Sequence, residues 1–312
     1  MSFLSFSTKK HSPGDSLFRG LTFLFALAVL ALALLIVWEL YRNSTLAQKA
    51  FGWKFLRLQN WDPVAEDFSA LPFIYGTLMS SAIALLMAVP LGIGVAIFLT
   101  ELAPPKISET CSFLIELLAA VPSVIYGLIG IFVVVPFMRE HVQPFLINHL
   151  GFLPFFKGPA YGIGLLTAAV ILAVMIVPFI TTISREVLMS VPREQKEAAM
   201  ALGATRWEVV RMAILPYARS GIAGSVFLAL GRALGETMAV TMVIGNSTKI
   251  FASILAPSYT MAAVLANEFA EADSEMYTQA LIEIGLVLFV ITIIVNGIAR
   301  LILTRMKVAH AQ

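Results

Sequence analysis

Residues 193–219 read REQKEAAMALGATRWEVVRMAILPYAR, a polar interruption between segments that are apolar enough to lie in lipid. Pro192 precedes the stretch and suits the start of a helix, because the first turn does not need its missing N–H. Gly203 suits the left-handed position that ends a helix. Thr205 and Glu208 have the spacing of a capping box, in which each side chain satisfies the other residue's backbone N–H. We therefore predict a helix–turn–helix outside the membrane that contacts another molecule.

The composition indicates a polytopic membrane protein. Of 312 residues, 59% are hydrophobic and only 13% are charged, against about 25% charged in ordinary soluble domains. The mean hydropathy is +0.89. The single cysteine excludes an intramolecular disulfide, the four histidines have no zinc-like spacing, and the sequence has no G-x4-G-K-[S/T] phosphate-binding loop. We expect an all-α membrane protein with no catalytic residues, metal, cofactor or nucleic-acid partner.

Six segments are predicted to cross the membrane, because each is an apolar run of about the length that a bilayer requires. The first is preceded by basic residues, so a cleaved signal peptide is the alternative interpretation. However, this run is longer than the usual apolar region of a signal peptide, roughly 7–15 residues, and we predict an uncleaved span. The six predicted spans are 21–38, 71–100, 112–137, 159–183, 220–245 and 279–302.

Residues 250–267 are also uncharged and long enough to cross, but Pro257 and Ser258 lie in their middle. With six spans, the polar stretch lies on the same side as both termini, and that side holds 13 of the 21 Lys and Arg residues. A seventh crossing would place the basic residues after the last span on the wrong face under the positive-inside rule. We therefore predict a re-entrant or interfacial segment, whose backbone must be covered by protein or line a water-filled cavity.

The polar stretch resembles the EAA-x3-G-x9-I-x-L-P signature of bacterial ABC importer permeases. The family's Ile falls on Ala213, with Ile214 beside it, which is a mild change at a packing position. In that family the signature forms the coupling helix that docks into a cytoplasmic ATPase subunit; the alternative is a solvated amphipathic loop. The resemblance implies an ATPase-coupling role for the matching residues, which are Glu197, Ala198, Ala199, Gly203, Leu215 and Pro216.

Two more runs, PSVIYGLIGIFV at 122–133 and LGRALGETMAVTMVIGN at 230–246, are similar to permeases of phosphate-specific transport systems, their C subunit rather than their A subunit. The similarity covers most of the chain from about residue 70. It implies a type I (MetI-like) importer permease in the bacterial inner membrane, with both termini cytoplasmic. It also implies phosphate as substrate and, as partners, an ATP-binding subunit, a second, A-type permease subunit and a periplasmic phosphate-binding protein, besides membrane lipid.

On this basis the chain divides into four predicted parts. They are a cytoplasmic segment at 1–20, the first span and a periplasmic loop at 21–70, the permease domain at 71–303 with coupling helices at 193–216, and a cytoplasmic tail at 304–312.

Arg232 and Glu236 lie inside an otherwise uncharged segment. Counted from a helix start at residue 220, Arg232 lies about 18 Å along the helix, near mid-membrane. An ionisable group there costs roughly 2.5–3.5 kcal/mol, so it must face protein or a polar pathway. The spacing allows an internal salt bridge; the alternative is an anion site in which the guanidinium binds phosphate bidentately. We favour the anion site, because apolar packing could replace a purely structural pair.

Glu236 would repel an anion unless its carboxylate accepts a hydrogen bond from protonated phosphate. Sulfate carries no proton at neutral pH and could not donate such a bond.

Gly231 and Gly235 form a G-x-x-x-G pattern, which predicts close packing against a partner permease or within the chain. Two carboxylates near span ends, Glu116 and Glu283, are expected at the interface. The acidic run Glu268, Glu271, Asp273 and Glu275 is expected to be a solvated loop; contact with a basic face of a binding protein is the alternative.

Two other functions remain open from the sequence. A permease for another oxyanion (molybdate, sulfate or phosphonate) would keep the coupling helix and change the substrate. An ion channel or a membrane enzyme is disfavoured, because a pore needs no such helix pair and no acid, base or metal ligands cluster.

Overall fold

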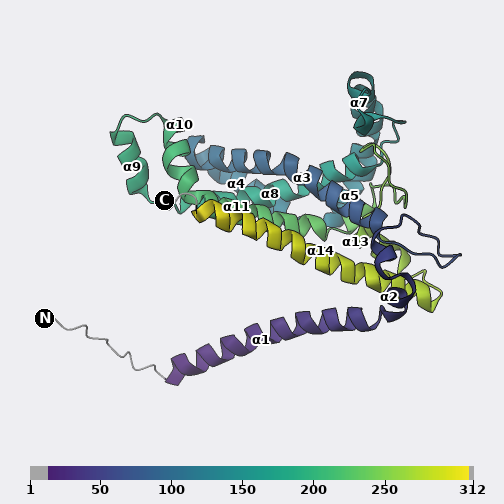
Figure 1. The fold of residues 1–312 in the computed structure, drawn as a ribbon. Helices are drawn as coiled ribbons and strands as arrows, with labels where there is room; N and C mark the ends of the chain where they lie inside the picture. Colours follow the sequence, from purple (N-terminus) through teal and green to yellow (C-terminus); the bar gives the residue numbers. More distant parts are fainter. Residues whose placement is uncertain (1–12, 309–312) are drawn as a thin grey trace.

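The computed structural model describes residues 13–308, and within them six helices are long and apolar enough to cross a membrane. Their number agrees with the six spans predicted, and the long helices run along one common direction (Figure 1). The six segments are Leu17–Arg42, Leu71–Leu102, Ser123–Leu150, Leu165–Met189, Arg206–Leu234 and Glu275–Leu301.

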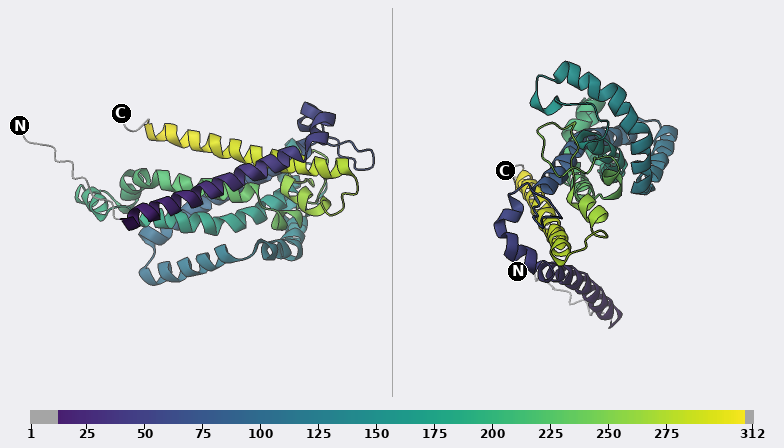
Figure 2. Two further views of the ribbon diagram at one scale, coloured as in Figure 1. Left: turned by 90° about the horizontal axis from the view of Figure 1, so that it is seen from below. Right: turned by 90° about the vertical axis from the view of Figure 1, so that its right-hand side faces the viewer.

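The first and last long helices are longer than the predicted spans. Helix α1 (Pro13–Arg42) begins within the predicted N-terminal segment, and α14 (Glu275–Val308) continues into the predicted tail. Helix α1 diverges from the other helices, and its side chains are mostly exposed (Figures 1 and 2). The start of α1 and the end of α14 lie at the same end of the molecule as α9 (Arg193–Ala201) (Figure 1).

The core is formed by α3 (Leu71–Ile97), α8 (Leu165–Met189) and α11 (Leu215–Leu234), with α8 the most buried of the spans. Small side chains line these contacts and let the helix backbones approach closely, which is how helices associate in lipid. At Gly92 of α3, a Cβ atom would lie 2.8 Å from the Ile180 side chain. The small buried residues are Ala84, Ala88, Ala168, Ala169, Ala229 and Ala233.

The third predicted span, 112–137, is not one continuous helix. Helix α4 (Pro105–Ala120) ends before Pro122, and α5 (Ser123–Ile129) begins after it. Val121 is extended, with ψ 130°, because a residue that precedes proline is disfavoured in the helical region. The chain continues through π-helical turns and α6 (Val135–Phe137) to α7 (Gln143–Leu150), which projects from the far end of the bundle (Figure 1).

The fifth predicted span, 220–245, is wrong at both ends. The helix is continuous from Arg206, through α10 (Arg206–Val209) and a π-helical turn into α11, and it ends at Leu234. Gly235 follows, a residue that weakens a helix, and a separate short helix, α12 (Met238–Thr241), begins beyond it.

Residues 242–260 are irregular and lead into α13 (Met261–Glu268), whose eight residues are too short to cross. The prediction of six spans rather than seven is therefore confirmed. Neighbouring segments satisfy much of the irregular backbone, as membrane depth requires. The bonds are Gly164 N to Val243 O (3.0 Å), Leu165 N to Ala256 O (3.0 Å), Leu166 N to Ile254 O (2.8 Å) and Met261 N to Thr77 Oγ1 (2.9 Å).

Helix α3 contacts the irregular segment at Gly76. A Cβ atom at this position would overlap the Tyr259 carbonyl oxygen, so only glycine permits the observed approach. The end of the irregular segment, residues 258–260, is consequently buried against α3, whereas Asn246, Lys249, Phe251 and Ala252 are exposed.

Candidate coupling helices and substrate pathway

The predicted helix–turn–helix is present at the end of the molecule where the chain protrudes (Figure 1). Helix α9 ends in a turn in which Gly203 has φ +88°, the left-handed conformation predicted for it. Its N–H bonds the Met200 carbonyl oxygen at 2.9 Å, and the Ala204 N–H bonds the Ala199 carbonyl oxygen at 3.2 Å. These bonds satisfy carbonyl groups that the end of α9 would otherwise leave unpaired.

The predicted capping box is also present. The Thr205 N–H donates to Glu208 Oε2 at 2.7 Å, and the Glu208 N–H donates to Thr205 Oγ1 at 3.4 Å. The box fixes the direction in which the chain enters the long helix that ends at Leu234. Two local sequence signals therefore determine the shape of this turn.

The base of the helix pair is anchored in a small apolar cluster. Ile214 is completely buried there, together with Leu188 and Val210, whereas Ala213 is half-buried. The isoleucine next to the family position thus fills the core, which explains why Ala213 is tolerated. Of the predicted coupling residues, Ala199 and Leu215 pack against this cluster, whereas Glu197, Ala198, Gly203 and Pro216 are exposed.

The tip of the helix pair exposes large apolar side chains. Leu202 is 90% exposed, and Trp207 and Met212 are also largely exposed. A hollow of about 400 Å³ between the two helices is lined by Ala199, Leu202, Gly203, Ala204, Glu208, Met212 and Ala213. Exposed apolar side chains with charged neighbours mark a protein-interaction surface.

An ion pair that sequence reasoning missed fastens α9 to the bundle. Lys196 Nζ lies 2.6 Å from Glu101 Oε1, at the end of the α3 span, and both side chains are mostly shielded from solvent. The only signal in the sequence is that Glu101 follows a long uncharged segment. A charge-assisted bond of this length is among the stronger polar contacts in proteins.

Arg232 lies in the last turn of α11, where a positive charge is favoured by the helix dipole. Its guanidinium carbon lies 5.6 Å from the centre of the Phe179 ring of α8, a cation–π contact. The side chain is half-buried, and within residues 13–308 no ion pair involves it. Because α11 starts at the coupling end and stops short of the far end, its last turn, which carries Arg232, lies between the two ends of the bundle (Figure 1).

Glu236 lies beyond the end of α11, so the two charged residues do not share a helix. Its Oε1 atom accepts a hydrogen bond from the Ala239 N–H at 3.1 Å, at the start of α12. The internal salt bridge that the spacing allowed is therefore not formed. Arg232 is left without a carboxylate partner among the described residues, and the Glu236 carboxylate is held by the Ala239 backbone N–H.

The two glycines of the G-x-x-x-G pattern do not pack within this chain. A Cβ atom at Gly231 would meet nothing within 4 Å, and one at Gly235 would meet only the Gly231 carbonyl oxygen, 3.7 Å away. Packing within the chain, one of the two predictions, is thereby excluded.

The other acidic residues considered in the sequence differ in their exposure to solvent. Glu116, Glu271, Asp273 and Glu275 are exposed. The expectation of a solvated loop is wrong for Glu268, whose Oε2 accepts hydrogen bonds from Trp61 Nε1 and from the Tyr277 hydroxyl, both at 2.8 Å. Glu283, expected near the interface, is 7% exposed, so its carboxylate does not reach solvent in the way a snorkelling side chain would. Within residues 13–308, no three His, Cys, Asp or Glu side chains lie close enough to hold a metal ion.

Reversing the charge of Lys196 tests whether its pair with Glu101 anchors α9. Lys196→Glu should lower the midpoint of thermal unfolding in detergent, by an amount equivalent to about 1–3 kcal/mol, because two carboxylates then face each other. Adding Glu101→Lys should restore most of the loss. Equal midpoints for the single and double variants would contradict the assignment.

The fold and the signature can be compared with known proteins. Residues 88–308 match the family model of the binding-protein-dependent transport system inner membrane component. The chain is 50% identical over 295 residues to the "Phosphate transport system permease protein PstC" of Mesorhizobium japonicum, covering 93% of this chain and 90% of that one. It is also 50% identical over 297 residues to the PstC permease of Haemophilus influenzae, covering 94% of each.

Solved structures agree in fold. A chain of the bacterial alginate ABC transporter, in complex with alginate pentasaccharide-bound periplasmic protein, superposes with a TM-score of 0.61 at 16% identity, covering 94% of this chain and 97% of that one. A chain of the inward-facing MetNI methionine ABC transporter gives 0.51 at 18% identity, covering 76% and 95%. The chain has the fold of type I ABC importer permeases. It belongs to the family of binding-protein-dependent transport system inner membrane components, and within that family to the PstC permeases.

Proposed function

We propose that the chain is the permease subunit of an ATP-driven importer that carries inorganic phosphate across the bacterial inner membrane. The observation that carries the proposal is Arg232, a half-buried guanidinium between the two ends of the bundle. It has no carboxylate partner among the described residues, and it lies on the same continuous helix as the second arm of the exposed coupling pair. An unpaired charge at this depth needs an anionic ligand or a polar pathway. Half of the residues are identical to those of permeases named for phosphate transport.

The helix pair at 193–216 is the contact with a cytoplasmic ATPase subunit. Its exposed apolar tip and the hollow beside Gly203 fit the docking of another protein. This assignment makes the α9 end cytoplasmic, and the beginning of α1 and the end of α14 then lie on that side as well. ATP hydrolysis occurs in the ATPase subunit, and this chain performs no covalent chemistry.

Phosphate passes Arg232 during transport. The guanidinium fork matches two phosphate oxygens, whereas a lysine ammonium would offer only a point charge. The Phe179 ring supports the guanidinium from one side while leaving its N–H groups available to the anion.

Glu236 provides selectivity. The Ala239 N–H holds Oε1, which leaves Oε2 to accept a hydrogen bond from a protonated phosphate oxygen. Sulfate has no such proton at neutral pH and meets only repulsion, and buried polar groups of this kind can discriminate strongly.

The remaining partners occupy the other exposed surfaces. A second, A-type permease packs against the end of α11 at Gly231 and the following Gly235, beside which no other segment of the described chain lies. A periplasmic phosphate-binding protein docks at the opposite end, where α7 projects (Figure 1). Lipid surrounds the outer apolar faces.

Arg232→Ala should reduce uptake of ³²P-phosphate about 10- to 100-fold in cells that lack other phosphate transporters, the effect of losing one charged hydrogen-bonding group. Arg232→Lys should retain part of the activity. Arg42→Ala, which removes an exposed arginine at the end of α1, away from α7 and α11, is the control. Full phosphate uptake by a correctly inserted Arg232→Ala variant would refute the role of Arg232. Failure of the wild type to take up phosphate would favour a permease for molybdate, sulfate or phosphonate.

Glu236→Gln should relax the preference for phosphate over sulfate. The amide oxygen can still accept from Ala239 N–H, while the repulsive charge is removed. Competition by excess sulfate in the phosphate-uptake assay measures the effect, with Glu271→Gln in the exposed loop as the control. Unchanged selectivity in an active Glu236→Gln variant would refute this role.

A further inference from the structure

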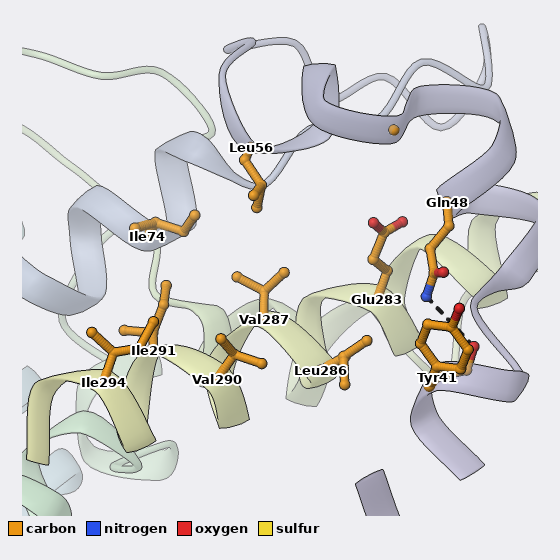
Figure 3. Close-up of a pocket in the computed structure, with 11 residues that line it drawn as sticks. Tyr41, Gln48, Leu56, Ile74, Glu283, Leu286, Val287, Val290, Ile291 and Ile294 are labelled. Atoms are coloured by element: carbon orange, nitrogen blue, oxygen red, sulfur yellow. Dashed lines mark hydrogen bonds between the residues drawn. The ribbon is translucent and has the colours of Figure 1, made fainter. Parts of the chain in front are cut away.

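A groove lies between α14 and the segment that joins α1 to α3, which contains α2 (Thr45–Phe51) and a 3-10 turn at Gly52–Leu56. It is lined by none of the coupling residues and not by Arg232. Its volume is about 410 Å³, and it is open on one side. Figure 3 shows that its polar side chains gather at one end, while α14 presents an apolar strip along the rest. The polar residues are Tyr41, Gln48 and Glu283, and the apolar strip consists of Leu286, Val287, Val290, Ile291 and Ile294.

Glu283 is the unexplained group in this groove. It is 7% exposed, and its Oε2 atom is buried without a hydrogen-bond partner among the described residues. The carboxylate points into the groove (Figure 3). Gln48 does not serve it, because the Gln48 amide nitrogen donates to Ser44 Oγ at 2.7 Å and to the Tyr41 carbonyl oxygen at 3.5 Å. Buried carboxylates without a donor are rare, since leaving one unpaired is costly.

The groove has the polarity of a membrane lipid. Glu283 lies about 12 Å along α14 from Glu275, and Ile294 lies about 16 Å further on, at 1.5 Å per residue. The polar end therefore faces the end of the bundle opposite the coupling helices, and the apolar strip leads toward its middle (Figure 1). Next to the groove, α1 exposes apolar side chains along its length, so this side of the molecule faces lipid.

We infer that the groove binds one phospholipid whose headgroup carries a protonated amine, of the phosphatidylethanolamine class. The ammonium group supplies three donors, which satisfy the unpaired Glu283 carboxylate in a charge-assisted bond. One acyl chain lies along the apolar strip. An anionic headgroup, such as that of phosphatidylglycerol, brings negative charge without a cationic donor and is repelled by the same carboxylate.

Native mass spectrometry of the full chain tests this inference. The detergent-purified protein is titrated with equimolar phosphatidylethanolamine and phosphatidylglycerol. The wild type should bind phosphatidylethanolamine about tenfold more tightly, the scale of one charge-assisted bond, and Glu283→Gln should abolish that preference. Glu275→Gln removes an exposed carboxylate on the same helix outside the groove, and should behave as the wild type.

A second variant keeps the test valid if Glu283→Gln does not fold. Val290→Trp fills the apolar part and should remove the bound lipid while Glu283 is intact; Ile293→Trp, on the exposed part of α14 outside the groove, should not. Equal binding of the two lipids by the wild type would overturn the inference. A preference that persists in a folded Glu283→Gln variant, or lipid that persists in Val290→Trp, would overturn it as well.

Discussion

The function proposed for this permease depends on the continuity of one helix. From the capping box at Thr205 to the last turn at Arg232, the backbone runs without a break, although it includes a π-helical turn at Val210–Ile214. A helix transmits force along its axis, so a movement applied at the exposed pair reaches the interior of the bundle. The buried Ile214 lies where this helix leaves the helix pair and fixes its packing against α8. The Lys196–Glu101 pair fastens the other arm to α3.

The second constraint is the absence of water at membrane depth. The irregular segment after α12 is possible only because the start of α8 and the side chain of Thr77 bind part of its backbone. Gly76 allows α3 to approach that segment closely enough to cover it. Because an unpaired polar group is costly where water is absent, the polar groups that lack a partner in this chain indicate ligands. Arg232 lies beside the passage that we propose for phosphate, and Glu283 lies in a groove that faces lipid.

Local sequence signals predicted the helix–turn–helix well, since Gly203 and the Thr205–Glu208 box act over a few residues. The number of spans was also predicted correctly, because it depends on the length of the apolar segments and on how the basic residues are divided between the two sides of the membrane. The end of α11 was not predicted, because residues 235–245 contain only one charged residue and resemble part of a span. In the structure these residues leave the helix and pack against α5 and α8. The partners of Glu101 and Glu268 come from distant segments, so no spacing in the sequence revealed them. The roles of Arg232 and Glu236 in transport remain proposals.

The central claim is that the turn at Gly203 connects ATP hydrolysis to movement of α11. Gly203 has open space around it but a left-handed φ of +88°, which costs other residues about 1–2 kcal/mol. Gly203→Val should therefore distort the turn and leave the bundle intact, and Gly94→Val, also in open space but helical, is the matched control. The direct measurement compares ATP hydrolysis with phosphate uptake in proteoliposomes that contain the assembled transporter. The account predicts that Gly203→Val keeps hydrolysis and loses most uptake; an unchanged ratio of uptake to hydrolysis would contradict it.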